Sequence, residues 1–263
     1  MAAMNRSKKR KNAIEKLNDL AINSSHILVI HYSCESFYDI QNGRTPRITS
    51  IAVRFFKTGQ TKSFSIHKVA ELKKVPFENI EDCYDELEKE MLSEFFKFLK
   101  EHKAYTWVHW NMRDINYGFE AIEHRFSVLG GKPISVDDSN KVDLSRYLVD
   151  IFGLKYIEHP RLESLINLNK ITKKDYLGGA AEATAFNNKE YVKLHQSTLR
   201  KVDMFQTILE RASDKTLKTR SKLRDVYGFS PQGIAEMIKE NWLLGLIWSA
   251  ITLVVGGYIG SLF

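Results

Sequence analysis

The sequence predicts an α/β fold followed by a single membrane helix, and three observations carry that prediction. Ile27–Ile30 is an unbroken aliphatic run, which is typical of a strand buried on both faces of a sheet. From Glu78 onward, apolar residues recur every three or four positions, as they do along amphipathic helices. Trp242–Phe263 carries no charged residue and is long enough to cross a hydrocarbon core of about 30 Å as a helix.

The composition narrows the class of protein. The chain has 263 residues, a formal net charge of +7 and a pI near 9.2. The positive charge fits a partner made of phosphates, either a nucleic acid or an anionic membrane surface. Cys34 and Cys83 lack the spacing of a zinc site, and no disulfide framework is expected, so a reducing cytoplasm fits. The basic run Arg6–Lys11 is most often a mobile, solvated tail, and a nucleic-acid arm or a lipid-surface contact is the alternative. No secretory signal is expected after it.

Three strands are expected in the first part of the chain. After the strand that begins at Ile27, the runs Ile48–Phe56 and Thr61–His67 are rich in β-branched and aromatic residues. Turn signals at Asn42-Gly43 and Thr58-Gly59-Gln60 separate the three runs. The sequence therefore predicts a three-strand meander.

The rest of the chain is predicted to be mostly helical, with a fourth strand over Tyr105–Trp110 and a loop at Gly178-Gly179. Apolar residues at helical spacing predict helices over Glu78–His102, Asp114–Val128, Val142–Phe152, Leu162–Ile171 and Tyr191–Ala212. The chain then divides into a basic N-terminal segment (1–24), a folded domain (25–213), a linker (214–241) and the membrane helix (242–263).

Polar residues follow the buried part of the first strand. Because side chains alternate along a strand, His31, Ser33 and Glu35 share one side, while Tyr32 and Cys34 share the other. Glu35 is thus expected at the edge of the sheet where open α/β folds bind their ligands. The simpler alternative is a solvated strand end with one glutamate on it.

The order of strands and helices over Ile27–Arg211 resembles the DEDD superfamily of 3′–5′ exonucleases, which has the ribonuclease H-like fold. The resemblance implies a mixed sheet flanked by helices. It also implies Asp-x-Glu on the first strand, an Asp after the fourth strand, and a final Asp on a late helix, preceded by a His or Tyr. In that family the four carboxylates hold two divalent ions, Mg²⁺ or Mn²⁺, which activate a water and stabilise the departing oxygen of the phosphodiester.

The resemblance implies catalytic and metal-binding roles for three carboxylates of this chain: Glu35, Asp114 in the run HWNMRD, and Asp203 in the run LRKVDMF. Ser33 stands at the position of the first aspartate, and a hydroxyl is a neutral and weak ligand for Mg²⁺. Either His31 compensates, together with His109, and shifts the preference toward Mn²⁺, or hydrolysis is lost and only a phosphate- or nucleotide-binding cleft is kept.

The expected general base also departs from the family pattern. Thr198 stands five residues before Asp203, and the nearest histidine, His195, lies eight residues before it, about two helical turns away. For each of these residues a structural role is the alternative. Asp114 suits the start of a helix, and His31 and His195 are each more often packing histidines than catalytic ones.

Side chains near the expected cleft also suit nucleic acid. Tyr32 is a candidate for stacking on a base, and Arg113 and Arg200 are candidates for contacting phosphates.

The C-terminal run is interpreted as a single-pass tail anchor, with the basic residues ahead of it placing the folded domain in the cytoplasm. A buried helix of the folded domain is the alternative. Gly245 and Ser249, like Gly256 and Gly260, are four residues apart, a spacing that lets membrane helices approach closely, so a homo-oligomer is a reasonable hypothesis.

Two functional hypotheses follow. The first is a membrane-anchored, metal-dependent nuclease that acts on nucleic acid or short oligonucleotides. The alternative is a catalytically degenerate nuclease fold that binds nucleic acid or a nucleotide and controls assembly of its membrane helix, for example as the toxic effector of a bacterial antiviral defence system. A third and plainer hypothesis is a membrane-tethered domain that binds only protein.

Overall fold

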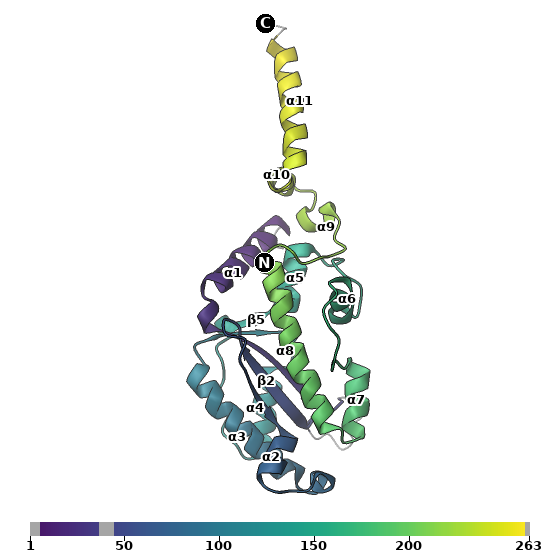
Figure 1. The fold of residues 1–263 in the computed structure, drawn as a ribbon. Coiled ribbons are helices and arrows are strands. Elements are labelled where there is room, and N and C mark those ends of the chain that lie inside the picture. The colour runs from purple at the N-terminus through teal and green to yellow at the C-terminus, as the bar shows by residue number, and fades with distance from the viewer. Residues whose placement is uncertain (1–5, 37–44, 261–263) are drawn as a thin grey trace.

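The computed structural model describes residues 6–36 and 45–260 and contains a five-stranded sheet in the order β3-β2-β1-β4-β5 (Figure 1). The strands are β1 (Ile27–Cys34), β2 (Ile48–Phe55), β3 (Thr61–Ser65), β4 (Thr106–His109) and β5 (Lys141–Asp143). β1 pairs with β2, and β2 with β3, in antiparallel fashion, whereas β1–β4 and β4–β5 are parallel. The sheet is therefore mixed, and the carboxyl ends of β1, β4 and β5 meet at one edge.

Helices cover both faces of the sheet, which confirms the α/β prediction (Figure 1). The helices of the folded domain are α1 (Arg6–Ile22), α2 (Ile66–Leu72), α3 (Tyr84–His102), α4 (Phe119–Val128), α5 (Leu144–Phe152), α6 (Arg161–Leu168), α7 (Gly179–Asn187) and α8 (Tyr191–Ser213).

The side chains of β1 alternate between two hydrophobic cores, because successive residues of a strand point to opposite faces. Leu28, Ile30 and Tyr32 pack with residues of α2, α3 and α4. Ile27 and Val29 pack with residues of α1, α5 and α8 on the other face. Burial on both faces explains why the sequence of this strand begins with a continuous aliphatic run.

Several element boundaries differ from the expectations. The helix expected from Glu78 begins at Tyr84, after two short 3-10 turns, and the helix expected from Asp114 begins at Phe119. Before Phe119, Asp114 and Tyr117 exchange two backbone hydrogen bonds of 3.1 Å, which close a tight turn instead of a helical one. The expected turn at Asn42-Gly43 lies outside the described residues.

β5 and α7 differ in type from the prediction, because β5 takes the first residues of the helix expected from Val142 and α7 begins where a loop was expected. β5 is short and pairs with β4, and its last residue, Asp143, caps α5 by accepting a hydrogen bond from the Arg146 backbone N–H. The expected loop at Gly178-Gly179 is instead the start of α7, with Gly178 at the N-cap. Both departures bring charged side chains to the edge of the sheet where β1 ends.

The expectation of a solvated tail over Arg6–Lys11 is wrong. This run is the first part of α1, in which Ser7 and Arg10 are buried and Ala13, Leu17 and Leu20 pack in the core. The apolar residues of α1 recur at helical spacing, so one face of the helix packs on the domain. The lysines of the basic run stay exposed.

The segment that follows α8 contains α9 (Leu223–Tyr227), α10 (Pro231–Glu240) and α11 (Trp242–Gly260), and α11 projects away from the domain (Figure 1). Within the part of the chain that the structure describes, no single helix is long and apolar enough by itself to cross a membrane. α10 and α11 satisfy that test of length and composition only together, as a pair bent by 110°. Residues 261–263 of the expected span lie outside the described residues.

Candidate functional site

A cavity of about 750 Å³ opens at the carboxyl end of β1, and we call it the β1 pocket. Its wall comes from the end of β1, the residues after β4, and helices α7 and α8, because these elements converge at one edge of the sheet. The residues that line it include His31, Tyr32, Ser33, Glu35, Trp110, Tyr117, Tyr176, Glu182, Lys201 and Phe205. The sequence-based expectation of a site at this edge therefore agrees with where the cavity lies.

An ion pair between Lys201 of α8 and Glu182 of α7 lines the pocket, and sequence reasoning missed it. Lys201 Nζ lies 2.6 Å from Glu182 Oε2, and the two side chains are only 7% and 15% exposed. The ammonium also lies 5.6 Å from the centre of the Tyr176 ring, and the Ser197 hydroxyl donates to Glu182 Oε1. The one available signal was a lysine among the apolar positions of the predicted helix.

Two polar atoms of β1 are buried in the pocket wall without a hydrogen-bond partner among the described residues: His31 Nε2 and Ser33 Oγ. The other ring nitrogen of His31 lies 3.3 Å from the Tyr117 hydroxyl. Burial, and then the nearby Lys201 charge, hold the pKa of His31 well below its usual range, so the ring is neutral. Buried polar groups usually have partners, so these two atoms mark where a ligand would bond.

Glu35 lies in the pocket wall, 7% exposed, as the sequence predicted. Its backbone N–H donates to the Arg47 carbonyl at 2.9 Å, and the Arg47 N–H approaches Glu35 Oε2 at 3.4 Å. These contacts fix the carboxylate beside the start of β2.

Aromatic rings form the remaining wall. Tyr32 and Tyr117 stack with ring centres 4.6 Å apart, and Trp110 and Phe205 stack at 5.7 Å. The Tyr32 hydroxyl accepts a hydrogen bond of 3.0 Å from the Gly118 N–H. Tyr32 as a whole is 2% exposed, so only a small part of this residue is open to a ligand.

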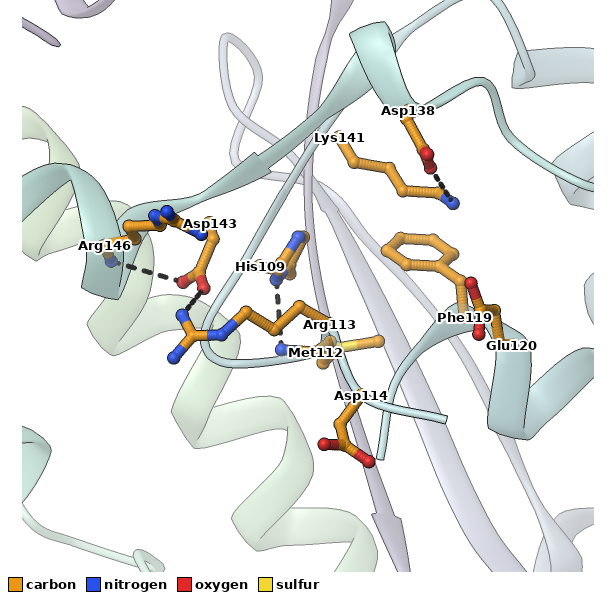
Figure 2. A pocket seen from close by; sticks show the side chains of 10 residues that line it. All are labelled: His109, Met112, Arg113, Asp114, Phe119, Glu120, Asp138, Lys141, Asp143 and Arg146. Atoms are coloured by element: carbon orange, nitrogen blue, oxygen red, sulfur yellow. Dashed lines mark hydrogen bonds and ion pairs between the residues drawn. The ribbon is translucent and has the colours of Figure 1, made fainter. Parts of the chain in front are cut away.

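Asp114 and Arg113 lie in a second cavity, of about 360 Å³, at the ends of β4 and β5; we call it the β4–β5 pocket (Figure 2). Asp114 is exposed and accepts a hydrogen bond of 2.8 Å from the Asn116 N–H. Arg113 donates to Asp143, whose other oxygen accepts from the Asn111 N–H at 3.2 Å. Figure 2 shows the Asp114 carboxylate apart from the Arg113–Asp143 pair. Asp114 and Glu35 therefore line different pockets.

Asp203 is also outside the β1 pocket. Lys201 and Asp203 are two residues apart on α8, which separates them by about 200° around the helix axis. Lys201 therefore faces the pocket, while Asp203 faces β2 and lies 3.6 Å from Arg54. Arg200 binds the same carboxylate at 2.8 Å and donates to the Lys174 carbonyl, so it too is engaged away from the pocket.

His195 packs under α2 and not in the pocket. Its ring lies 5.0 Å from that of His67, and burial lowers its pKa to about 3. Thr198, which stands near the family position of the general base, has its hydroxyl 2.7 Å from that of Ser50 on β2. The structure thus places both residues in the contact between α8 and the elements it covers.

The donor set of the β1 pocket differs from the four-carboxylate centre that the resemblance implies. Glu182 is paired with Lys201, and Glu35 and Ser33 are further oxygen-bearing residues of the lining. Across residues 6–36 and 45–260, no three histidine, cysteine or acidic side chains are grouped so that they could hold a metal ion. These residues do not fit a two-ion centre.

Comparisons with known proteins identify no relative: no family model, no curated protein and no solved structure matches the chain. The class defined by the structure is therefore an α/β domain with a mixed sheet, a pocket at the carboxyl end of β1, and an apolar C-terminal helix.

Proposed function

We propose that the folded domain is a ribonuclease H-like module that binds a nucleotide, or the end of a nucleic acid, in the β1 pocket without hydrolysing it. The observation that carries the proposal is the Lys201 ammonium in the pocket wall, where it is paired with Glu182. An ammonium has three N–H donors, so Lys201 can donate to a phosphate oxygen as well as to Glu182. The mixed sheet flanked by helices is the architecture that the resemblance implies.

The other groups of the pocket suit the rest of such a ligand. A volume of about 750 Å³ lies in the range of small-ligand sites. Trp110 and Tyr176 provide aromatic surface for a base, which every nucleotide can use. His31 Nε2 and Ser33 Oγ are unpartnered polar atoms that would hydrogen-bond to ring nitrogens, carbonyls or hydroxyls.

The proposed output of binding is assembly of the membrane helix. α11 has no charged residue and its described side chains are mostly exposed, so it would lie in lipid as a single-pass anchor with the domain on the cytoplasmic side. Gly245, Ser249, Gly256 and Gly260 all lie within α11, where small residues would allow a second copy to pack closely. This arrangement suits a defence effector that is triggered by a nucleotide or nucleic acid.

The test is a binding and cleavage assay on the detergent-solubilised full chain. Mononucleotides, dinucleotides and short DNA and RNA strands labelled at either end are offered in Mg²⁺ or Mn²⁺. We expect binding without shortening of the strands. Lys201→Gln should weaken binding roughly tenfold or more, because hydrogen bonds to charged groups contribute about 1.5–3 kcal/mol.

Two controls separate binding from folding. Lys193→Gln removes an exposed lysine of the same helix, paired with Glu190, and should leave binding unchanged. Lys201→Gln with Glu182→Gln removes both charges, so that no unpaired charge stays buried. Metal-dependent shortening that Glu35→Ala abolishes would instead establish the nuclease, and failure to bind any nucleotide or strand at low salt would indicate a protein-binding domain.

A further inference from the structure

α10, the helix just before the apolar α11, has one face bonded to the domain. The Ser7 hydroxyl donates to Glu236 Oε1 at 2.7 Å, and the Arg10 guanidinium donates to both oxygens of Glu240 at 2.8 and 2.7 Å. The Tyr227 hydroxyl donates to Glu240 as well, at 2.9 Å. The carboxylates of α10 thus hold it against the first turns of α1.

The opposite face of α10 is aliphatic. Ile234 precedes Glu236 by two positions, which places it about 200° around the helix from that carboxylate, and Ile238 lies one turn further on the same side. Ile234 is 43% exposed, and Phe229, just before the helix, is 82% exposed. Exposed apolar residues on a helix and immediately before it are candidates for a contact surface.

The bend between the two helices sets the direction of the α10 axis relative to α11. α10 and α11 are bent by 110°. If α11 runs along the membrane normal, α10 lies about 20° from the membrane plane, since a right angle would place it flat. That is the orientation of an interfacial amphipathic helix.

Basic residues lie at the same end of the molecule. Lys8 and Lys9 are exposed on the first turns of α1, between Ser7 and Arg10 in the sequence, and neither forms an ion pair with another described residue. Lys239 is exposed on α10 itself. Lysines at this position are complementary to anionic lipid headgroups.

We propose that α10 is an interfacial helix on an anionic bilayer, with Ile234 and Phe229 in the lipid and Lys8 and Lys9 at the headgroups. The inference rests on the proposal that α11 is the membrane anchor. It adds a surface, a lipid class and a role for α1, which would hold α10 in the plane of the membrane.

The test uses the full chain in vesicles of phosphatidylcholine alone or mixed with phosphatidylglycerol. Single cysteines replace Ile234 or, as the matched control, Gln232, which is exposed on the carboxylate face. A membrane-impermeant maleimide is added, and labelling is measured at each position by peptide mass. In anionic vesicles we expect Ile234→Cys to react roughly tenfold more slowly than Gln232→Cys.

The lipid class is tested in the same background. Lys8→Gln with Lys9→Gln should raise the labelling rate of Ile234→Cys in anionic vesicles toward the rate in neutral ones. Vesicle flotation reports separately on the anchor. If the protein floats with the vesicles but the two cysteines are labelled equally fast, α10 is not an interfacial helix, although α11 is still a membrane anchor. Chain that does not float overturns both, and protection that depends on protein concentration instead of lipid would assign the face to a second copy.

Discussion

The charge inside the β1 pocket depends on which side of α8 a residue occupies. Lys201 faces the pocket and Asp203 faces Arg54 on β2, although the two are nearly adjacent in the chain. Breaking a buried ion pair such as Lys201–Glu182 costs about 3–5 kcal/mol, while the intact pair contributes little net stability.

His109, at the end of β4, makes stability dependent on pH. Its Nδ1 accepts the Met112 N–H at 3.1 Å, which requires an unprotonated nitrogen, and burial lowers its pKa to about 4 (Figure 2). The unfolded chain therefore binds more protons than the folded chain between about pH 6.5 and 4. Stability is fully present above this window and should be lost as the pH falls through it.

The measurement is the urea midpoint of the full chain in detergent at several pH values across this window. His109→Gln keeps an acceptor for Met112 but does not titrate, so its midpoint should fall less steeply with acidification. His31 and His195 shift in the same direction and will leave a residual slope in the variant. Identical slopes for the two proteins would contradict the assignment.

At the scale of the element, α1 holds the helices that precede the membrane segment. The Arg10 guanidinium binds Glu240 and lies 4.7 Å from the centre of the Tyr227 ring, so one side chain connects α1, α9 and α10. Glu240 is 46% exposed, and solvent therefore weakens this ion pair.

We predict that Arg10→Met loosens α10 without unfolding the domain. Amide exchange in α10 should become roughly threefold to tenfold faster, because partly exposed pairs contribute about 1 kcal/mol, while exchange in β1 stays unchanged. Lys11→Met is the matched control, since Lys11 is exposed and its ion pair is with the exposed Glu15 of its own helix. Equal exchange in the two variants would show that Arg10 does not hold α10 in place.

At the scale of the whole molecule, the pocket and the apolar helix are separate parts. The β1 pocket is lined by residues between His31 and Phe205, whereas α11 packs on α10 and projects from the domain (Figure 1). Ligand binding and membrane attachment should therefore be separable by truncation.

Deletion of Trp242–Phe263 should leave nucleotide affinity within about twofold of the full chain, since no pocket residue is removed, and should abolish flotation with vesicles. Growth arrest on overexpression, if assembly of the membrane helix causes it, should survive Glu35→Ala and disappear with the deletion. Arrest that Glu35→Ala abolishes would favour the nuclease.

The sequence by itself determined the α/β class, the central buried strand, the long amphipathic helices and the apolar C-terminal run. These follow from hydrophobic periodicity, which is local along the chain. It also located Glu35, Ser33 and His31 correctly at one edge of the sheet, because alternation along a strand needs no tertiary information.

Only the tertiary structure decided which charges meet. Glu182 and Lys201 come together because α7 folds back along α8, and Asp114 is carried into the β4–β5 pocket by a tight turn that spacing does not reveal. β5 is too short to give a periodic signal in the sequence, and it forms a strand because it pairs with β4. The basic N-terminal run is helical as the start of α1, whose later apolar residues pack with those of α5 and α8. Pairing across long sequence separation is set by packing, which local patterns do not encode.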